Sequence, residues 1–392
     1  MIHRALLDLL IARLNQSPAV ALHGARQTGK TTLATQVGRQ LDAVYFDLED
    51  PQHYDLFADP VSLINQHRHR LVIIDEAQRR PELFPLLRVA IDRDRRPGRF
   101  LLLGSASPDL SRQRAESLAG RVSIVDLPPL TLQEVTAAGI TRDALWLRGG
   151  FPKSLLAETD ESSMQWRRDY LRDFFDRDLR LLGFDLAPER ARRCFLMLTH
   201  VHGQLWNASQ LSRSLDVSAH TANRYLDALC QTYLVRRLVP HFANIGKRLR
   251  KAPKVYLADT GLLHALLGIP NKDALLHHPA AGFSWEGFVV EQVAALLPFG
   301  WELSFWRTSG GSEIDILLLN AAQPAIAIEA KLGETNPRPR RGFHQACADL
   351  QIPNRWLVYP GHQSYELDGN YHLLPLSEML ERLRGIVGSA PS

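Results

Sequence analysis

Short apolar runs alternate with longer polar or amphipathic stretches through the first third of the chain. Five runs have the length of strands and lie at residues 19–22, 43–48, 71–74, 100–103 and 122–125. Four consecutive apolar residues are typical of a strand that is buried on both faces of a parallel sheet. The segment after the first run, residues 33–41, can continue as a helix. The pattern predicts an α/β fold.

The middle of the chain has the pattern of several helices. Residues 164–182 place aromatic side chains on roughly one side and many arginines and aspartates on the other, which we interpret as a solvated face without chemistry. Shorter helices are predicted at 189–200, 207–215 and 219–229, and a strand at 233–239. Ser218 is expected to cap the last of these helices. This order predicts a winged helix-turn-helix.

The C-terminal part has a mixed pattern of helices and strands. Helices are predicted at 285–297 and 343–350, and strands at 301–306, 314–319, 325–330 and 356–359. A length of 392 residues is enough for two or three domains that each bury a core.

Composition excludes several classes of protein. Hydrophobic residues make up 45% and charged residues 22%, which excludes a disordered or fibrous chain. The three cysteines are far apart and form no C-x-x-C pair, so neither a disulfide framework nor a zinc site is predicted. Residues 1–14 have amphipathic helix spacing, and no apolar run approaches the roughly 18 residues that span a bilayer. We expect a cytoplasmic protein without a membrane partner.

The segment between the first strand and the first helix carries the clearest chemical motif. It fits G-x-x-x-x-G-K-[ST] at every fixed position, in the order strand, loop, helix. Glycines let backbone N–H groups turn toward phosphate oxygens, Lys30 supplies a charge for the β and γ phosphates, and Thr31 offers a hydroxyl to Mg²⁺. The alternative is a glycine-rich turn before an ordinary helix. We predict a site for ATP and Mg²⁺ at Gly24, Ala25, Arg26, Gln27, Thr28, Gly29, Lys30, Thr31 and Thr32.

Acidic residues follow the third apolar run directly. A carboxylate at the C-terminal end of a parallel strand lies beside the phosphate loop, so Asp75 is predicted to hold the Mg²⁺ shell and Glu76 to orient and polarise the attacking water. After the fourth run, Ser105 can act as a polar sensor of the γ-phosphate; the alternative is a strand-end turn residue. Arg121, before the fifth run, can bring positive charge to the transition state of its own or a neighbouring subunit; the alternative is a solvated surface arginine.

Several motifs together resemble a known family. The series GARQTGKTT, LVIIDEAQ, LLLGSAS, SLAGRV, LPPLTLQE and LRGGFPKSLL resembles the AAA-type ATPases of a prokaryotic ATP-binding protein family with a C-terminal domain of uncharacterised function. The resemblance implies an ATPase core in residues 1–145 with the AAA strand order, and a helical lid in 146–187. It also implies that Pro152 lies near the nucleotide base and that Arg121 is an arginine finger, which requires a homo-oligomer if it acts across a subunit boundary.

The helix-turn-helix region, residues 188–268, carries candidate DNA contacts. Its second helix presents His220, Thr221, Asn223 and Arg224, side chains able to reach bases or phosphates. No acidic residue lies between Asp227 and Asp259, and basic residues there can contact the phosphate backbone. They are Arg236, Arg237, Lys247, Arg248, Arg250, Lys251 and Lys254. The alternatives are a helix-turn-helix in a core that never touches DNA, and a basic loop that pairs with acids elsewhere.

The C-terminal region, residues 280–388, has a candidate second site. Asp315 begins one predicted strand, and Glu329 and Lys331 end the next, where carboxylates from adjacent strands can hold a divalent cation and a lysine can activate water. Their order resembles the PD-(D/E)xK nuclease fold, which implies that Glu286 completes the metal shell and Gln345 is the trailing polar residue. The alternative is a remnant of that fold that contacts protein or DNA without cutting.

Together these features predict an ATP hydrolase that binds DNA, branched DNA included, and couples hydrolysis to DNA remodelling. Two alternatives stay open. One is an ATP-gated nuclease that uses the C-terminal site, and the other is a nucleotide-switched regulatory or defence protein that binds DNA without moving it.

Overall fold

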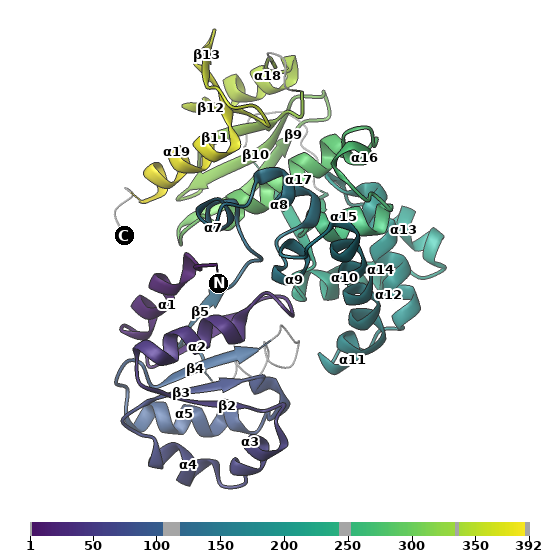
Figure 1. Ribbon diagram of the computed structural model, residues 1–392. Coiled ribbons are helices and arrows are strands. Elements are labelled where there is room, and N and C mark those ends of the chain that lie inside the picture. Colours follow the sequence, from purple (N-terminus) through teal and green to yellow (C-terminus); the bar gives the residue numbers. More distant parts are fainter. Residues whose placement is uncertain (1, 105–117, 243–251, 334–336, 389–392) are drawn as a thin grey trace.

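A computed structural model describes residues 2–104, 118–242, 252–333 and 337–388 of the chain (Figure 1). Two β-sheets lie at opposite ends of the molecule, and a group of helices lies to one side between them (Figure 1). None of the helices in the described ranges combines the length and the apolar surface that a membrane span requires.

The first sheet has five strands that all run parallel. They are β1 (Ala19–His23), β2 (Ala43–Asp47), β3 (Leu71–Asp75), β4 (Phe100–Gly104) and β5 (Val122–Asp126). Their order in the sheet is β2-β3-β4-β1-β5, which confirms the predicted AAA order. The C-terminal ends of β1 and β3 therefore lie at the same edge, with only β4 between them.

Helices cover both faces of this sheet, which explains the continuous apolar runs. Alternate residues of β3 point to opposite faces, so Leu71 and Ile73 pack with α1 and α2, whereas Val72 and Ile74 pack with helices on the other face. The helices on the first face are α1 (Leu6–Leu14) and α2 (Lys30–Gln40). Those on the second are α3 (Pro51–Leu56), α4 (Pro60–Gln66), the 3₁₀ turn η1 (Ala77–Arg79) and α5 (Leu83–Arg93).

The middle of the chain folds into a helical unit. Its elements are α9 (Pro152–Leu155), α10 (Asp160–Asp173), the π-helical turn η2 (Phe174–Asp178), α11 (Leu179–Leu181), α12 (Pro188–Leu198), η3 (Thr199–Val201), α13 (Ala208–Leu215) and α14 (Ala219–Gln231). The helix-turn-helix is thus formed by α13 and α14, and the predicted cap is confirmed because Ser218 Oγ accepts the Thr221 N–H at 3.0 Å. One hydrophobic cluster extends from Ala25 in the phosphate loop to Leu226 in α14.

The second sheet has nine strands in the order β13-β14-β12-β11-β10-β9-β7-β8-β6. Three belong to the winged helix, β6 (Gln204–Leu205), β7 (Val235–Pro240) and β8 (Lys254–Leu257). The others are β9 (Trp301–Arg307), β10 (Glu313–Asn320), β11 (Gln323–Ala330), β12 (Asn354–Tyr359), β13 (Tyr365–Leu367) and β14 (Tyr371–Pro375). Strands β7 and β9 pair in parallel at Val239 and Ser304, so the winged helix and the C-terminal module share one sheet.

Helices cover the C-terminal part of this sheet on both faces. α17 (Ala281–Ala294) and α19 (Leu376–Gly388) pack on one face, where Ile316 and Ile328 contribute to the same cluster, and α18 (Arg341–Asp349) packs on the other with Leu317. Two further helices, α15 (Thr260–Leu267) and α16 (Lys272–Leu276), connect the winged helix to this module.

The segment after the first sheet packs against the C-terminal module. Helices α7 (Leu132–Ala137) and α8 (Arg142–Arg148) belong to the hydrophobic cluster of α17 and α19. Trp146 stacks edge-on against Trp285 at 5.3 Å between centroids, and its Nε1 donates to Ser284 Oγ at 3.0 Å. The apolar side chains of residues 130–135 and 145–147 are buried with the other end of the chain, so this segment packs apart from the five-stranded sheet, and the predicted boundary of the ATPase core at residue 145 stays a prediction.

Candidate functional site

The phosphate loop follows β1 and leads into α2. Gly24 has φ 155° and Gly29 has φ 98°, backbone conformations that favour glycine. A Cβ at Gly24 would lie 2.5 Å from the carbonyl oxygen of Leu127, so that glycine is required by packing as well as by conformation. The first turn of α2 leaves N–H groups without partners inside the helix, which is the arrangement that binds a phosphate.

Lys30 lies inside the loop and is 6% exposed. Its Nζ donates to the carbonyl oxygens of Gly24 at 3.0 Å and Ala25 at 2.8 Å. Burial lowers the pKa of the Lys30 ammonium to about 8, and the carboxylates of Glu76 and Asp75 oppose this shift. The side chain is therefore held in the loop. Its charge can change as the pH passes through about 8.

The oxygen ligands predicted for a divalent cation lie together. Thr31 Oγ1 donates to Asp75 Oδ2 at 2.6 Å, and Tyr45 donates its hydroxyl to the same oxygen at 2.7 Å. A hydroxyl and a carboxylate are the oxygen ligands that Mg²⁺ prefers, so these residues fit Mg²⁺ beside a bound triphosphate. The metal would polarise the phosphate oxygens when present. Tyr45 was not predicted, and the sequence contains no motif that would reveal it.

Glu76 follows β3 in the left-handed conformation, with φ 50° and ψ 43°. Its backbone N–H donates to Asp75 Oδ1 at 2.9 Å, and Gln78 donates to its Oε2. Burial raises the pKa of Glu76, and the positive charges of Lys30 and Arg26 oppose this shift. A carboxylate with a raised pKa beside the phosphate loop suits the predicted role of orienting and polarising water, which stays a prediction.

Arg26, in the phosphate loop, is joined to the helical unit by a partly buried ion pair. Its Nη1 contacts Asp178 Oδ1 in η2, and the Asp178 side chain is 3% exposed. Arg177 also contacts Asp178 at 2.9 Å. The interpretation of residues 164–182 as a solvated charged face is therefore wrong for Asp178, and also for Arg167, which is fully buried and donates to the carbonyl oxygens of Leu147 and Gly261.

A second arginine supports the loop from the other side. Arg4 donates to the carbonyl oxygen of Thr28 at 2.9 Å and of Pro128 at 2.6 Å, and pairs with Glu134 at 3.0 Å. Glu134 in turn accepts the Thr131 N–H at 2.9 Å. Sequence reasoning missed Arg4, because it lies 20 residues before the motif, in a segment predicted only as an amphipathic helix; in the structure it precedes α1.

The remaining predicted ATPase residues have different positions. Pro152 begins α9 and is half-buried, and its neighbour Phe151 shares a hydrophobic cluster with Ala25 of the phosphate loop. Ser105 lies outside the described residues. Arg121 precedes β5 and makes two hydrogen bonds to Asp92, at 2.8 and 2.9 Å.

Arg121 lies at the wrong end of the sheet to reach the phosphate loop of its own chain. Val122 pairs with Ala19, whereas Asp126 pairs with His23 directly before the loop. The length of β5 separates Arg121 from that edge, on the order of 13 Å at about 3.3 Å per residue. Of the two predicted modes, action within its own subunit is therefore wrong, and only action on a second copy is compatible with this position.

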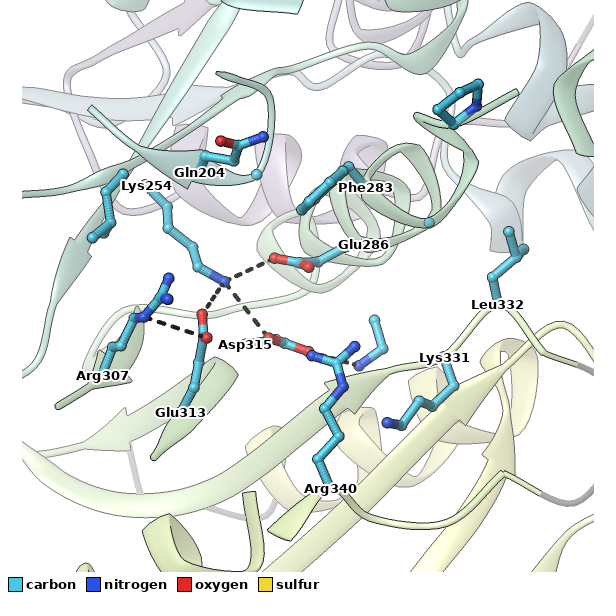
Figure 2. A pocket seen from close by; sticks show the side chains of 15 residues that line it. Gln204, Lys254, Phe283, Glu286, Arg307, Glu313, Asp315, Lys331, Leu332 and Arg340 are labelled. Carbon is cyan, nitrogen blue, oxygen red and sulfur yellow. Dashed lines mark hydrogen bonds and ion pairs between the residues drawn. The ribbon is translucent and has the colours of Figure 1, made fainter. Parts of the chain in front are cut away.

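A second candidate site lies where the winged helix meets the C-terminal module (Figure 2). Its cavity has a volume of about 780 Å³ and is lined by side chains from β6, β8, α17, β9, β10 and β11. Lys254 of β8 is 2% exposed and points into a group of carboxylates (Figure 2). Its Nζ lies 3.0 Å from Glu286, 3.0 Å from Glu313 and 3.6 Å from Asp315.

These contacts affect the titration of the buried groups. Burial alone would lower the pKa of Lys254, but Tyr256 and the carboxylates, Glu286 first, hold it well above its usual value. Burial, together with the nearby Glu286, raises the pKa of Asp315 to about 6. The lysine is therefore charged at neutral pH.

Glu329 makes a separate group. It pairs with Lys331 at 2.8 Å and with Arg340 at 3.3 Å, and accepts the Arg340 N–H at 3.2 Å. Among the described residues, no three histidine, cysteine, aspartate or glutamate side chains converge to hold a metal ion. The predicted metal shell of Glu286, Asp315 and Glu329 is therefore not formed. Lys254 lies between Glu286 and Asp315, and the basic side chains of Lys331 and Arg340 pair with Glu329. Gln345 is exposed on α18 and donates to Asp349.

The predicted DNA contacts on α14 fall into two groups. Asn223 accepts the Trp206 indole N–H at 2.8 Å, and Thr221 hydrogen-bonds to the capping Ser218 at 2.9 Å, so both have local structural roles. His220, Asn223 and Arg224 are exposed. Three of the four predicted side chains on α14 are therefore exposed, and Thr221 is partly buried.

The basic stretch of the wing is partly internal. Arg236 makes two hydrogen bonds to Glu291 in α17 at 2.6 and 2.8 Å, Arg237 pairs with Asp227, and Lys254 pairs with the carboxylates of the cavity. For these three residues the alternative of pairing with acids elsewhere is correct. Four further basic residues lie outside the described residues: Lys247, Arg248, Arg250 and Lys251.

The five-stranded sheet and its phosphate loop define the class of protein, an AAA-type P-loop ATPase. The model of the AAA domain matches residues 16–136. Two domains of unknown function match the rest, DUF8612 at residues 141–273 and DUF4143 at residues 281–379.

Two curated relatives cover nearly the whole chain. They are the uncharacterized proteins Rv2008c of Mycobacterium tuberculosis and Mb2031c of Mycobacterium bovis, each 46% identical over 367 residues, which is 94% of this chain and 82% of the relative. The chain therefore belongs to their family, a prokaryotic family of AAA-type ATPases with additional domains of unknown function.

Solved structures resemble the chain only weakly. The Walker-type ATPase PABY2304 of Pyrococcus abyssi is 16% identical, with a TM-score of 0.42 over 68% of this chain and 96% of that chain. The RuvB Holliday junction branch migration motor of Thermotoga maritima is 19% identical, with a TM-score of 0.29 over 60% of this chain and 90% of that chain. The family assignment follows from the mycobacterial relatives.

Proposed function

We propose that this ATPase uses Mg²⁺, binds DNA through α13 and α14, and couples ATP hydrolysis to remodelling of that DNA. The observation that carries the proposal is the partly buried ion pair between Arg26 and Asp178, which joins the phosphate loop to the helical unit that contains the helix-turn-helix. A change at the phosphate loop on nucleotide binding would act directly on this pair.

Aromatic packing extends this contact toward α14. Tyr170 and Phe174 stack at 6.5 Å, Phe174 and Phe175 meet edge-on at 5.0 Å, and Phe175 packs on Phe195 of α12 at 5.6 Å. Helix α12 lies in the same hydrophobic cluster as Leu211 and Leu226 of the helix-turn-helix. Close-packed side chains of this kind transmit small displacements, since protein interiors have low compressibility.

The proposal is tested by ATP hydrolysis with no DNA, single strands, duplex and four-way junctions. DNA-stimulated turnover, accompanied by strand displacement or junction movement, supports coupling to remodelling. The variant Asp178→Asn is expected to lower the ratio of DNA-stimulated to basal turnover, because Arg26 loses its charged partner in η2. Turnover that no DNA form changes would contradict the proposal.

A second candidate is a nucleotide-switched protein that binds DNA without moving it. The shared nine-stranded sheet favours it, because the winged helix and the C-terminal module cannot separate without breaking the pairing of β7 with β9. DNA affinity that depends on the bound nucleotide, without any strand displacement, would distinguish the switch from the motor. An ATP-gated nuclease has no comparable support.

Salt dependence tests the DNA contact itself. We expect replacement of Lys247, Arg248, Arg250 and Lys251 by alanine to flatten log K against log [salt] by about 3 units if each residue contacts a phosphate, and Arg224→Ala alone by about 1 unit. A matched control is Lys272→Ala with Arg382→Ala, since these surface residues pair with Asp143 and Glu378. An unchanged slope in the fourfold variant would mean that the wing does not contact nucleic acid.

We further propose that Arg121 completes the ATP site of a second copy of the chain, because it lies too far from the phosphate loop of its own chain. ATP turnover per chain is then expected to rise with protein concentration as copies associate, and Arg121→Ala should remove the rise while leaving ATP affinity unchanged. Arg95→Ala is a suitable control, because Arg95 also pairs with Asp92 but is more exposed. Turnover that does not depend on concentration would contradict this role.

A further inference from the structure

The carboxylates of the C-terminal cavity surround a lysine from another part of the chain. Lys254 belongs to strand β8 of the winged helix, whereas Glu286, Glu313 and Asp315 belong to α17 and β10 of the C-terminal module. Figure 2 shows the ammonium between the three carboxylates, which approach it from different sides. It lies where the resemblance to PD-(D/E)xK nucleases implies a divalent cation.

The backbone holds this lysine in place. Lys254 pairs with Leu238 of β7 on one side and with Leu205 of β6 on the other, in the antiparallel sheet of the winged helix. Its ammonium also lies 5.6 Å from the centre of the Phe305 ring, at the start of the C-terminal module. The Lys254 backbone is therefore held in the middle of three strands, and its buried side chain extends from there into the cluster.

Most of the carboxylate oxygens of the cluster already have partners. Glu286 Oε1 accepts from Lys254 and from the Tyr256 hydroxyl at 2.6 Å, and Asp315 Oδ2 accepts the Ala330 N–H at 3.3 Å. Glu313 contacts Lys254 with one oxygen and Arg307 with the other, at 3.5 Å. A hard divalent cation needs several such oxygens at once and would also be repelled by the ammonium.

The lysine of the nuclease-like motif is also engaged. Lys331, which would activate water in a nuclease, is paired at 2.8 Å with Glu329, the carboxylate that would complete the metal shell. The residues of the motif are thus all present, but their charges are neutralised by side chains of this chain. The geometry does not fit a resident metal ion.

We propose that Lys254 is a fixed internal cation that takes the place of a divalent metal in this cavity, so that the cluster fastens the winged helix to the C-terminal module and does not cut DNA. Removing one member of a buried ion pair leaves the others without a counter-charge, which makes the group a determinant of how the two parts fit together.

Binding of Mn²⁺ to the full-length protein tests this proposal. We would titrate the Asp75→Asn variant, which lacks the acidic ligand predicted at the ATP site, and follow free Mn²⁺ by electron paramagnetic resonance. We expect the double variant Asp75→Asn with Asp315→Asn to bind the same number of Mn²⁺ ions as Asp75→Asn alone. An Mn²⁺ site that disappears with Asp315→Asn would overturn the proposal, as would Mn²⁺-dependent DNA cleavage lost in Asp315→Ala.

The complementary variant is Lys254→Met, which removes the charge and keeps an unbranched side chain that is one atom shorter. In the Asp75→Asn background it is expected to gain one Mn²⁺ site that Asp315→Asn removes, and Mn²⁺ should raise its melting temperature but not that of the parent. Absence of this gain in the folded variant would overturn the replacement of a metal by lysine. If Lys254→Met does not fold, the first comparison still decides, because it leaves Lys254 in place.

Discussion

Lys30→Ala is expected to lower kcat for ATP hydrolysis by roughly 10²- to 10³-fold, the range observed when one preorganised charge-stabilising donor is removed from an active site. The Lys30 ammonium lies inside the phosphate loop, 3.0 Å from the carbonyl oxygen of Gly24, and is predicted to meet the β and γ phosphates of ATP. The measurement is phosphate release by the wild-type protein and by Lys30→Ala, at saturating ATP with and without DNA.

Lys272→Ala is the matched control, because Lys272 is a half-exposed surface lysine that pairs with Asp143. Activity of Lys30→Ala close to that of this control would contradict the assignment of the site. A second readout is the pH dependence of ATP binding. Burial lowers the pKa of Lys30 to about 8 in the free protein, so the charged form that attracts phosphate is lost as pH rises through that value.

The sign of the pH effect follows directly. Bound ATP favours the protonated form of Lys30. The affinity of the protein for ATP is therefore expected to be constant below about pH 8 and to fall by about tenfold for each pH unit above it. The guanidinium of Lys30→Arg stays protonated, so any affinity that this variant retains should not fall over the same range. An equally steep fall in Lys30→Arg would mean that another group titrates.

Glu76→Gln is the second change with a large expected effect. It should lower kcat by about 10²- to 10⁴-fold, the usual contribution of a general base, while ATP affinity changes little. The amide keeps the size of the side chain and can still orient water, but it cannot accept a proton. The measurement is ATP turnover together with equilibrium binding of ATP to the same protein.

Glu82→Gln provides the control, since Glu82 is an exposed glutamate that pairs with Arg80 near the same strand. Burial raises the pKa of Glu76, so the wild-type rate should fall on the acidic side, at a higher pH than an exposed carboxylate would give. A loss of less than about tenfold in Glu76→Gln would assign the base to another residue.

Most of the ATPase fold could be predicted because its strands are mostly apolar. The five runs before residue 126 match β1 to β5 closely, and the motif identifies the loop after β1. The association of residues 130–147 with the C-terminal module could not be predicted, because an apolar helix face does not specify its partner. The same holds for the pairing of β7 with β9, which joins strands about 65 residues apart.

The candidate sites were predictable where their residues are close in sequence. Lys30 and Thr31 belong to one motif, and Asp75 follows a recognisable strand. Asp178 and Lys254 could not be found in this way, because each is a charged residue in a charged stretch, and burial alone distinguishes it from its neighbours. The C-terminal motif includes Glu286 and Asp315 but not Glu313, and their common partner Lys254 belongs to a stretch that the sequence alone assigns to a DNA-binding wing.

The pairing of β7 with β9 has a mechanical consequence for any nucleotide-driven motion. One sheet continues from the winged helix into the C-terminal module, so the two are expected to move as one rigid unit. Helices α7 and α8 are packed onto this unit. Residues 127–130 connect the ATPase sheet to this rigid unit, and Leu127 lies against the phosphate loop at Gly24. Bending is therefore expected at this short segment, directly beside the nucleotide, so that a small rotation there would swing both the helix-turn-helix and the C-terminal cavity together.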